Sequence, residues 1–263
     1  MENKAHDSKI LNQLRCDILE ASARSSEGHI PSAFSILDIL FCVYLYDSHS
    51  RMQNLERFDY NFILSKGHGS LALYAVLSEA GFFDKSWIKD FGGYGSRFGG
   101  HPDRNKVPGV MASTGSLGHG LPIAVGVALA NRISGKKQRS IVLIGDGELN
   151  EGSNWESLLL ASHHHLNNLT VIIDSNHSSD RALELGDLES KLNSFGFSTQ
   201  IIDGHDHIQI VKALEFVDES KPRAIVAKTI KGNGIREMEN NPAWHHAFPS
   251  QEKLEVFQKD LSV

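Results

Sequence analysis

The sequence predicts an α/β fold in which a parallel sheet carries helices on both faces. Short apolar runs rich in β-branched residues recur along the chain, and segments of helical length with helical periodicity separate them. Such alternation is typical of parallel sheets, because parallel strands are joined by crossover helices. The length of 263 residues suits one large α/β domain. We therefore expect a single domain over residues 1–263.

The first half of the chain is expected to be mainly helical. Apolar residues three and four apart predict helices at 10–23 and 35–46. A strand is predicted at 61–65 and a further helix at 70–77. The segment 121–133 is rich in Ala, Val and Gly, which predicts a helix that packs closely against its neighbours.

The second half alternates regularly between strands and helices. Its final segment, 250–263, is amphipathic, and two outcomes are open for it: packing on a partner chain or fraying. The predicted elements before it are a strand at 140–144, a helix at 153–164, a strand at 170–174, a helix at 187–195, a strand at 198–202, a helix at 207–217 and a strand at 223–229.

Composition excludes several classes of function. The net charge is −6 with Lys and Arg scattered, so we expect no nucleic-acid partner. No run approaches eighteen apolar residues and the polar start lacks a signal-peptide core, so we expect a cytoplasmic protein without a membrane span. Cys16 and Cys42 have no metal-ligand spacing and are expected to be reduced core residues.

A metal site is predicted where two neighbouring strands end. Asp146 follows the strand 140–144 in a Gly-Asp-Gly sequence, and Asn176 follows the strand 170–174. Ligands collect at the carboxyl ends of parallel strands, and oxygen donors from two such ends suit Mg²⁺ bound with phosphates. Gly-Asp-Gly alone is also an ordinary turn sequence. The asparagine after the second strand favours the metal site.

This pattern, Gly145-Asp146-Gly147 with Asn176 thirty positions after the aspartate, resembles the thiamine diphosphate signature. Other stretches are similar to transketolase, in the same order and over nearly the whole chain. More narrowly, the chain resembles the N-terminal, diphosphate-binding half of a split transketolase. The stretches that carry this likeness are Ser26–His29, Phe62–Gly69, Gly100–Pro102, Thr114–Gly120 and Met238–His245.

The resemblance implies thiamine diphosphate and Mg²⁺ as cofactors. It implies that the side chains of Asp146 and Asn176 and the main-chain carbonyl of Ser178 bind the metal. After Asn176 the chain departs from the usual family pattern, reading His-Ser-Ser-Asp-Arg-Ala-Leu. The cofactor contacts implied by the resemblance are His68, Gly115, Leu117, Asp146, Gly147, Glu148, Asn176 and His245.

The resemblance also implies the reaction, transfer of a two-carbon ketol unit from a ketose, or ketose phosphate, to an aldose. The thiazolium ring is the electron sink, and the protein supplies orientation and proton transfer. Histidines suit proton transfer near neutral pH. The family pattern places His29, His101 and His245 around the reacting carbons.

Other polar and aromatic residues receive plainer interpretations. Neighbours on a helix point in different directions, so the three histidines at 163–165 cannot converge on one metal. Trp155 and Phe195 are expected in the core. Glu151 resembles an acidic residue that links the two active sites of a dimer, where it could share a proton with its symmetry mate. The remaining histidines expected at the surface are His205, His207 and His246.

A catalytic element is expected to lie on another chain. In transketolases the glutamate that activates the cofactor's amino group belongs to the second domain, and this sequence ends near where that domain would start. We expect a dimer of heterodimers formed with a separate C-terminal subunit, and this chain to be inert alone. Two alternatives remain: the α subunit of a 2-oxoacid dehydrogenase or decarboxylase of the E1 type, and a non-catalytic relic of the fold.

Overall fold

The computed structural model describes residues 2–46, 60–180 and 182–261, with side chains from residue 6 onward. Its contacts divide the chain into two compact units, each of which is treated by itself. The sheet unit comprises the described parts of His49–Gly67 and Val110–Thr229. The helical unit comprises the described parts of Met1–Ser48, His68–Gly109 and Ile230–Val263.

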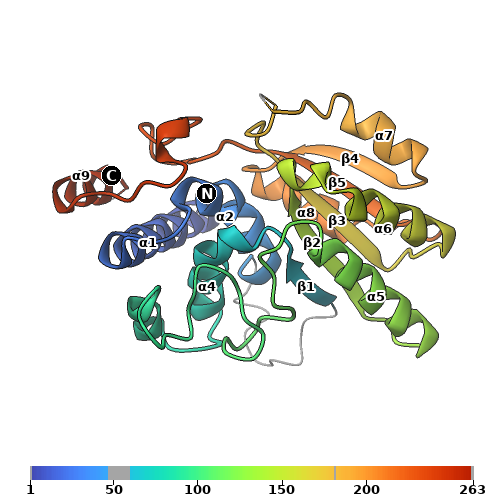
Figure 1. The fold of residues 1–263 in the computed structure, drawn as a ribbon, viewed down its shortest axis with the longest axis horizontal. Coiled ribbons are helices and arrows are strands. Elements are labelled where there is room, and N and C mark those ends of the chain that lie inside the picture. The colour runs from blue at the N-terminus through green and yellow to red at the C-terminus, as the bar shows by residue number, and fades with distance from the viewer. Residues whose placement is uncertain (1, 47–59, 181, 262–263) are drawn as a thin grey trace. The chain divides into compact units, whose positions relative to one another are not determined.

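The sheet unit is built on five strands, counted over the described residues, which are all parallel and lie in the order β1-β2-β3-β5-β4 (Figure 1). Every residue of β3 is buried, as expected of a central parallel strand with a continuous apolar sequence. The predicted strands are confirmed to within one residue at each end. The strands are β1 (Tyr60–Leu64), β2 (Arg139–Gly145), β3 (Leu169–Ser175), β4 (Ser198–Asp203) and β5 (Arg223–Lys228).

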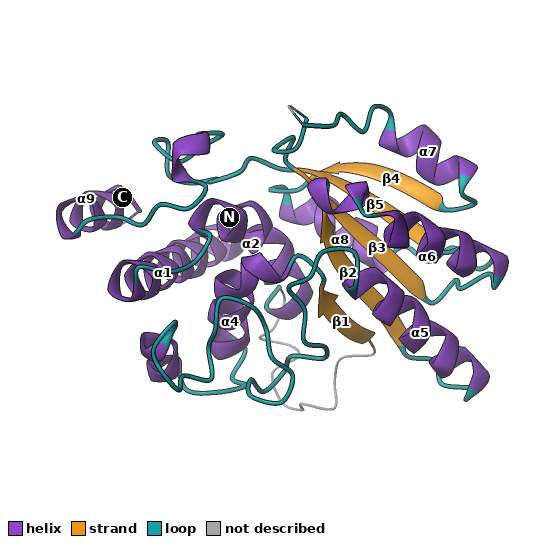
Figure 2. Cartoon of the chain, in the orientation of Figure 1, coloured by secondary structure: helices purple, strands orange, loops and turns teal. Residues whose placement is uncertain are grey.

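Four helices of the sheet unit match the predicted ones: α5 (Gly120–Ile133), α6 (Gly152–His163), α7 (Leu188–Ser194) and α8 (His207–Glu215). Figure 2 shows α5, α6 and α7 on one face of the sheet and α8 on the other. This is the arrangement that right-handed crossovers require, because the chain reverses its direction across the sheet between β4 and β5. The predicted parallel sheet with helices on both faces is therefore confirmed.

The core of the sheet unit lies between the sheet and the helices on it. Val142 and Val171 from the strands and Leu158 from α6 are fully buried there. Trp155 and Phe195 are partly buried and pack on this core, with ring centroids 5.1 Å apart. They occupy the packing positions expected from the sequence.

The pairing register of β2 and β3 positions the predicted metal ligands. Gly145 lies opposite Asp174, and the Asp146 amide donates to the Asp174 carbonyl oxygen over 3.1 Å. The two strands therefore end side by side. Residues that follow them, Asp146 on one strand and Asn176 on the other, emerge at the same edge of the sheet.

The helical unit contains α1 (Glu2–Ser25), α2 (Ile30–Tyr44), α4 (Ser70–Glu79) and α9 (Gln251–Leu261). The helix α2 begins five residues before the predicted start at 35, because proline is well tolerated in a first helical turn and Pro31 lies there. Residues 30–43 of α2 are all buried. Among the described helices, none has the length and hydropathy needed to cross a bilayer.

The C-terminal segment neither frays nor waits for a partner. It forms α9, whose apolar side chains Leu254, Phe257 and Leu261 are buried within the helical unit. The side-chain amide of Asn12 on α1 donates to the Leu261 carbonyl over 2.8 Å. The Phe257 ring packs edge-on against Trp244, with centroids 5.7 Å apart. The segment is thus anchored on its own chain.

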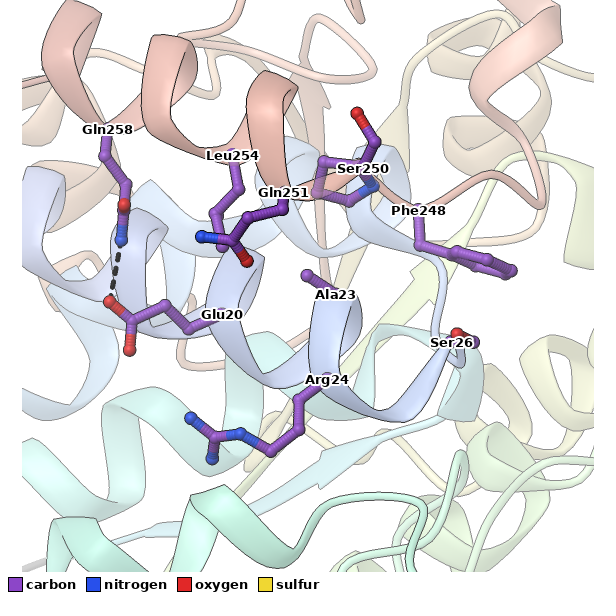
Figure 3. A pocket seen from close by; sticks show the side chains of 10 residues that line it. Glu20, Ala23, Arg24, Ser26, Phe248, Ser250, Gln251, Leu254 and Gln258 are labelled. Carbon is purple, nitrogen blue, oxygen red and sulfur yellow. Dashed lines mark hydrogen bonds between the residues drawn. The ribbon is translucent and has the colours of Figure 1, made fainter.

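Between α1 and the segment 248–258 the surface has a hollow with mostly polar, exposed side chains (Figure 3). The Gln258 side chain crosses it and donates to Glu20 over 2.7 Å. None of the predicted site residues lines this hollow. The candidate sites lie elsewhere.

Candidate functional site

Asp146 is held in a fixed orientation at the end of β2. Its side chain is 5% exposed, and its two oxygens accept hydrogen bonds from the amides of Gly147 (2.7 Å) and His177 (2.6 Å). Burial, followed by the negative charge of Asp174, raises the pKa of Asp146, whereas the two amides and the Lys66 ammonium oppose that rise. A divalent cation beside this carboxylate would favour its charged form.

Asn176 is equally constrained at the end of β3. It is 7% exposed, and its side-chain NH₂ donates to Asp174 over 2.9 Å. Its Oδ1 therefore points away from Asp174 and accepts the Ser178 amide over 3.1 Å. The intervening His177 adopts a left-handed backbone with φ 60°. Because the His177 amide bonds to Asp146, the loops after β2 and β3 are tied together.

The donor set of this pocket fits a hard divalent ion and a pyrophosphoryl group. A carboxylate and an amide oxygen lie on two linked loops, and such oxygens are the ligands that Mg²⁺ prefers. Close by, the Ser179 hydroxyl oxygen is buried and lacks a hydrogen-bond partner within the described chain. A Cβ on Gly147 would come within 3.2 Å of the Ser179 Cβ, so glycine keeps this approach open. Ser178, the predicted third ligand, is exposed on the same loop.

Two charged residues that the sequence reasoning missed lie under this site. Lys66, 1% exposed, forms an ion pair with Asp174, which is fully buried. The hydroxyl of Thr229 donates to the other carboxylate oxygen of Asp174. A charge that ends a fully apolar strand was the available signal, since unpaired charges are almost never buried.

Glu148, a predicted cofactor contact, directs its carboxylate toward its own chain. It is 2% exposed and accepts hydrogen bonds from the Ser65 hydroxyl, the Gly118 amide (2.9 Å) and the Gly145 amide (3.3 Å). Burial raises its pKa. The structure thus gives Glu148 a role in bracing three segments, and direct contact of its side chain with a cofactor remains a prediction.

The loop that carries Gly115 and Leu117 is braced at both ends. The Thr114 hydroxyl donates to the Leu64 carbonyl over 2.6 Å, at the end of β1. A Cβ on Gly67 would lie 2.8 Å from the backbone of Thr114 and Gly115, so only glycine fits that contact. Gly118, at φ 81°, accepts a hydrogen bond from the Ser153 hydroxyl (2.7 Å). This loop is a rigid backbone surface of the sheet unit.

The helical unit brings the predicted catalytic histidines together. The ring of His29 lies 5.3 Å from that of His68 and 5.7 Å from that of His245, centroid to centroid. His101 lies close enough for its charge to affect the pKa of His29. The Tyr74 hydroxyl donates to the His101 carbonyl over 3.0 Å, which fixes the backbone there. We call His29, His68, His101, His245 and His246 the histidine cluster.

His246 was expected to be an ordinary surface residue, and that interpretation is incomplete. Its side chain is exposed, but its ring packs against His29 with centroids 4.2 Å apart. The signal in the sequence was its position next to His245, because two neighbours in a tight turn can both reach one ring. The turn is rigid, since Trp244 is buried and the Asn241 side chain caps it by accepting the Ala243 amide over 3.1 Å.

The electrostatics of the cluster keep His29 neutral. Burial lowers its pKa to about 4, with further lowering by His246, His245, His101 and Lys231. Lys231 was also missed in the sequence; its Nζ lies 3.2 Å from Nδ1 of His245. An ammonium can only donate, so Nδ1 of neutral His245 accepts and its proton resides on Nε2. The pKa of His245 is lowered by burial and by Lys231.

The remaining predictions concern residues outside these two sites. The histidines at 163–165 end α6, where Arg132 donates to the carbonyls of His164 and His165. No group of three or more His, Cys, Asp or Glu side chains could hold a metal in the described part of the chain, in line with the expectation for that triplet. Glu151 is exposed at the start of α6. His205 and His207 are half-buried beside α8.

Comparisons with known proteins agree with this geometry. The family model "Transketolase, thiamine diphosphate binding domain" matches residues 6–262. One of the two subunits of an apulose-4-phosphate transketolase from Actinobacillus succinogenes is 38% identical, over 94% of this chain and 93% of its own length. Its namesake in Phocaeicola vulgatus is 30% identical, over 93% and 90%.

The solved structures give the same answer. The crystal structure of transketolase from Campylobacter jejuni matches 97% of this chain with a TM-score of 0.84 at 29% identity. The chain spans only 42% of that protein. The chain therefore belongs to the transketolase family and comprises its thiamine diphosphate-binding domain.

Proposed function

We propose that this chain is the diphosphate-binding subunit of a two-chain transketolase that depends on thiamine diphosphate and Mg²⁺. The observation that carries the proposal is the fixed pair Asp146 and Asn176, whose oxygens lie on linked loops at one edge of the sheet. Relatives of almost the same length are named as transketolase subunits, not as whole transketolases, which supports a two-chain enzyme.

In this proposal the metal is held by Asp146, Asn176 and the carbonyl of Ser178. When bound, the cofactor supplies a thiazolium ring that accepts the electrons of the cleaved carbon–carbon bond. The two units belong to one domain, and they contribute different contacts to the cofactor. These contacts are His68, Gly115, Leu117, Gly147, Glu148 and His245.

The histidine cluster carries out the proton transfers. His29 is neutral at physiological pH, so one of its ring nitrogens can accept a proton from a substrate hydroxyl while the other can donate. His245 presents a proton on Nε2, because Lys231 occupies its Nδ1 side. His101, on its fixed backbone, binds hydroxyl groups of the ketose donor. Together these rings hold the substrate hydroxyls and move protons at them.

The remaining machinery lies on a partner in this proposal. A C-terminal subunit supplies the glutamate that activates the cofactor's amino group, and two such pairs form a dimer of heterodimers in the cytoplasm. Glu151, exposed at the start of α6, would lie near the symmetry axis. The names of the relatives make apulose 4-phosphate the first donor to test.

Reconstitution tests the proposal. The chain is mixed with its candidate C-terminal subunit, thiamine diphosphate and Mg²⁺, and two-carbon transfer from a ketose phosphate to an aldose phosphate is measured. Transfer that needs both chains is the expected result. Release of carbon dioxide from a 2-oxoacid without ketol transfer would instead assign the E1-type function. Absence of cofactor binding in the complex would favour the non-catalytic relic.

A further inference from the structure

We propose that Asp174 is a positioning residue for the metal ligand Asn176, and that Lys66 serves as the built-in countercharge of Asp174. The inference rests on the proposed function of this site. It adds two residues that do not contact the metal themselves.

The hydrogen bonds around Asp174 fix the direction of the Asn176 amide. An ionised carboxylate can only accept hydrogen bonds, so Asp174 selects the NH₂ end of Asn176, which lies 2.9 Å away. The oxygen of the amide must then face the other way. A flipped amide would present NH₂ to a cation and could not bind it. Asp174 therefore excludes the orientation that would abolish metal binding.

Asp174 is itself held by strands on both sides of β3. Lys66 follows β1, and its ammonium forms an ion pair with the Oδ2 atom of Asp174. Thr229 follows β5, and its hydroxyl donates to Oδ1, while its amide donates to the Ser175 carbonyl over 3.2 Å. Asp174 is fully buried. The carboxyl ends of three strands thus converge on one carboxylate.

The charges explain why a lysine is buried here. Asp146 and Asp174 would be two carboxylates at neighbouring strand ends, and a buried charge is stable only when it is paired. Lys66 pairs with Asp174, whereas Asp146 is held by two backbone amides. The negative charge of Asp174 is therefore matched within the protein. The charge of Asp146 is left for a metal ion.

Two double variants separate orientation from charge. Both K66M/D174N and K66M/D174L are neutral at this position and lack the ion pair. The asparagine introduced by D174N retains an oxygen that can accept the Asn176 NH₂, whereas the leucine introduced by D174L has none. The measurement is the affinity of the two-chain complex for thiamine diphosphate with Mg²⁺, by titration calorimetry, with circular dichroism as a check of folding.

We expect K66M/D174N to bind within about threefold of wild type and K66M/D174L to bind about 10- to 100-fold more weakly, the range for lost outer-shell contacts. T229V is the matched control, since it removes a donor to Asp174 that does not touch Asn176, and we expect an effect of about threefold or less. If K66M/D174L does not fold, K66M/D174A replaces it.

Equal affinity of the two double variants would overturn the inference, as would a T229V loss as large as that of K66M/D174L. Failure of the wild-type complex to bind cofactor and Mg²⁺ is a different result. It would contradict the proposed function itself.

Discussion

The two candidate sites of this chain are built on opposite principles. In the sheet unit, Asp146 and Asn176 are 5% and 7% exposed, and hydrogen bonds from neighbouring loops fix their side chains. In the helical unit, the exposed rings of His101, His245 and His246 lie on loops and turns. A hard ion needs oxygens held in one geometry, whereas proton transfer needs groups that substrate can reach.

The two sites also differ in how their residues are distributed along the chain. The oxygen donors of the sheet unit come from loops after consecutive strands, and register alone brings them together. The histidine cluster gathers residues near positions 29, 68, 101 and 245, and tertiary packing of the helical unit brings these together. Substitutions in the first site should therefore change binding, and substitutions in the second should change turnover.

The largest effect is expected for Asp146→Ala. It removes a charged metal ligand, so we expect cofactor affinity in the presence of Mg²⁺ to fall by more than about 100-fold, beyond the range for outer-shell residues. Calorimetry on the two-chain complex measures it. Asp180→Ala, which removes an exposed carboxylate paired with His177, is the matched control and should bind normally. Normal binding by Asp146→Ala would contradict the division between the sites.

A second substitution tests the opposite site. We expect His101→Ala to lower kcat by about 100-fold, a typical loss for a group that positions or transfers protons. The affinity for thiamine diphosphate should stay within about threefold, because His101 is placed on the substrate and not on the cofactor. Steady-state kinetics and calorimetry together measure the contrast. His6→Ala, on the exposed part of α1, is the control. Loss of cofactor binding in His101→Ala would remove the distinction between the two sites.

His246→Gln tests the electrostatics of the cluster. The change removes an imidazole that packs on His29 and helps to lower its pKa. We expect the pKa of His29 to rise from about 4, as measured by NMR titration of the histidine ring signals. The KM for the ketose donor should rise by about 2- to 10-fold, corresponding to one hydrogen bond. An unchanged His29 titration would show that the ring contact has no electrostatic effect.

The smallest effect concerns the pH dependence of stability. The pKa of His29 is about 4 in the folded chain, against an ordinary value of 6.5, so between these values the unfolded chain binds more protons. The free energy of unfolding should therefore fall as pH drops from 6.5 toward 4. Urea denaturation at several pH values measures this slope. His29→Gln should have a shallower slope, and an identical slope would contradict the low pKa.

Much of this arrangement followed from the sequence, because local patterns determine it. The five strands depend on runs of β-branched residues, and Asp146 and Asn176 depend on their positions after two such runs. The start of α2 was misplaced because Pro31 was not used as a helix-start signal. His246 and Lys231 were missed for another reason. Their roles arise from contacts between distant segments, which periodicity does not report.

The orientation of Glu148 shows a second limit. Its position in the Gly-Asp-Gly-Glu sequence indicated a cofactor contact, but its carboxylate binds Ser65 and the amides of Gly118 and Gly145. A motif gives the residue and not the direction of its side chain. Direction depends on which donors surround a buried carboxylate, and here they belong to three separate segments.

Locating the metal would test the proposed oxygen site without relying on variants. Crystals of the two-chain complex grown with thiamine diphosphate and Mn²⁺ in place of Mg²⁺ would give an anomalous signal at the ion. We predict one peak at coordination distance, about 2 Å, from a carboxylate oxygen of Asp146 and from Oδ1 of Asn176. A peak held by other residues, or bound cofactor with the Asn176 oxygen turned away from the metal, would contradict the proposal.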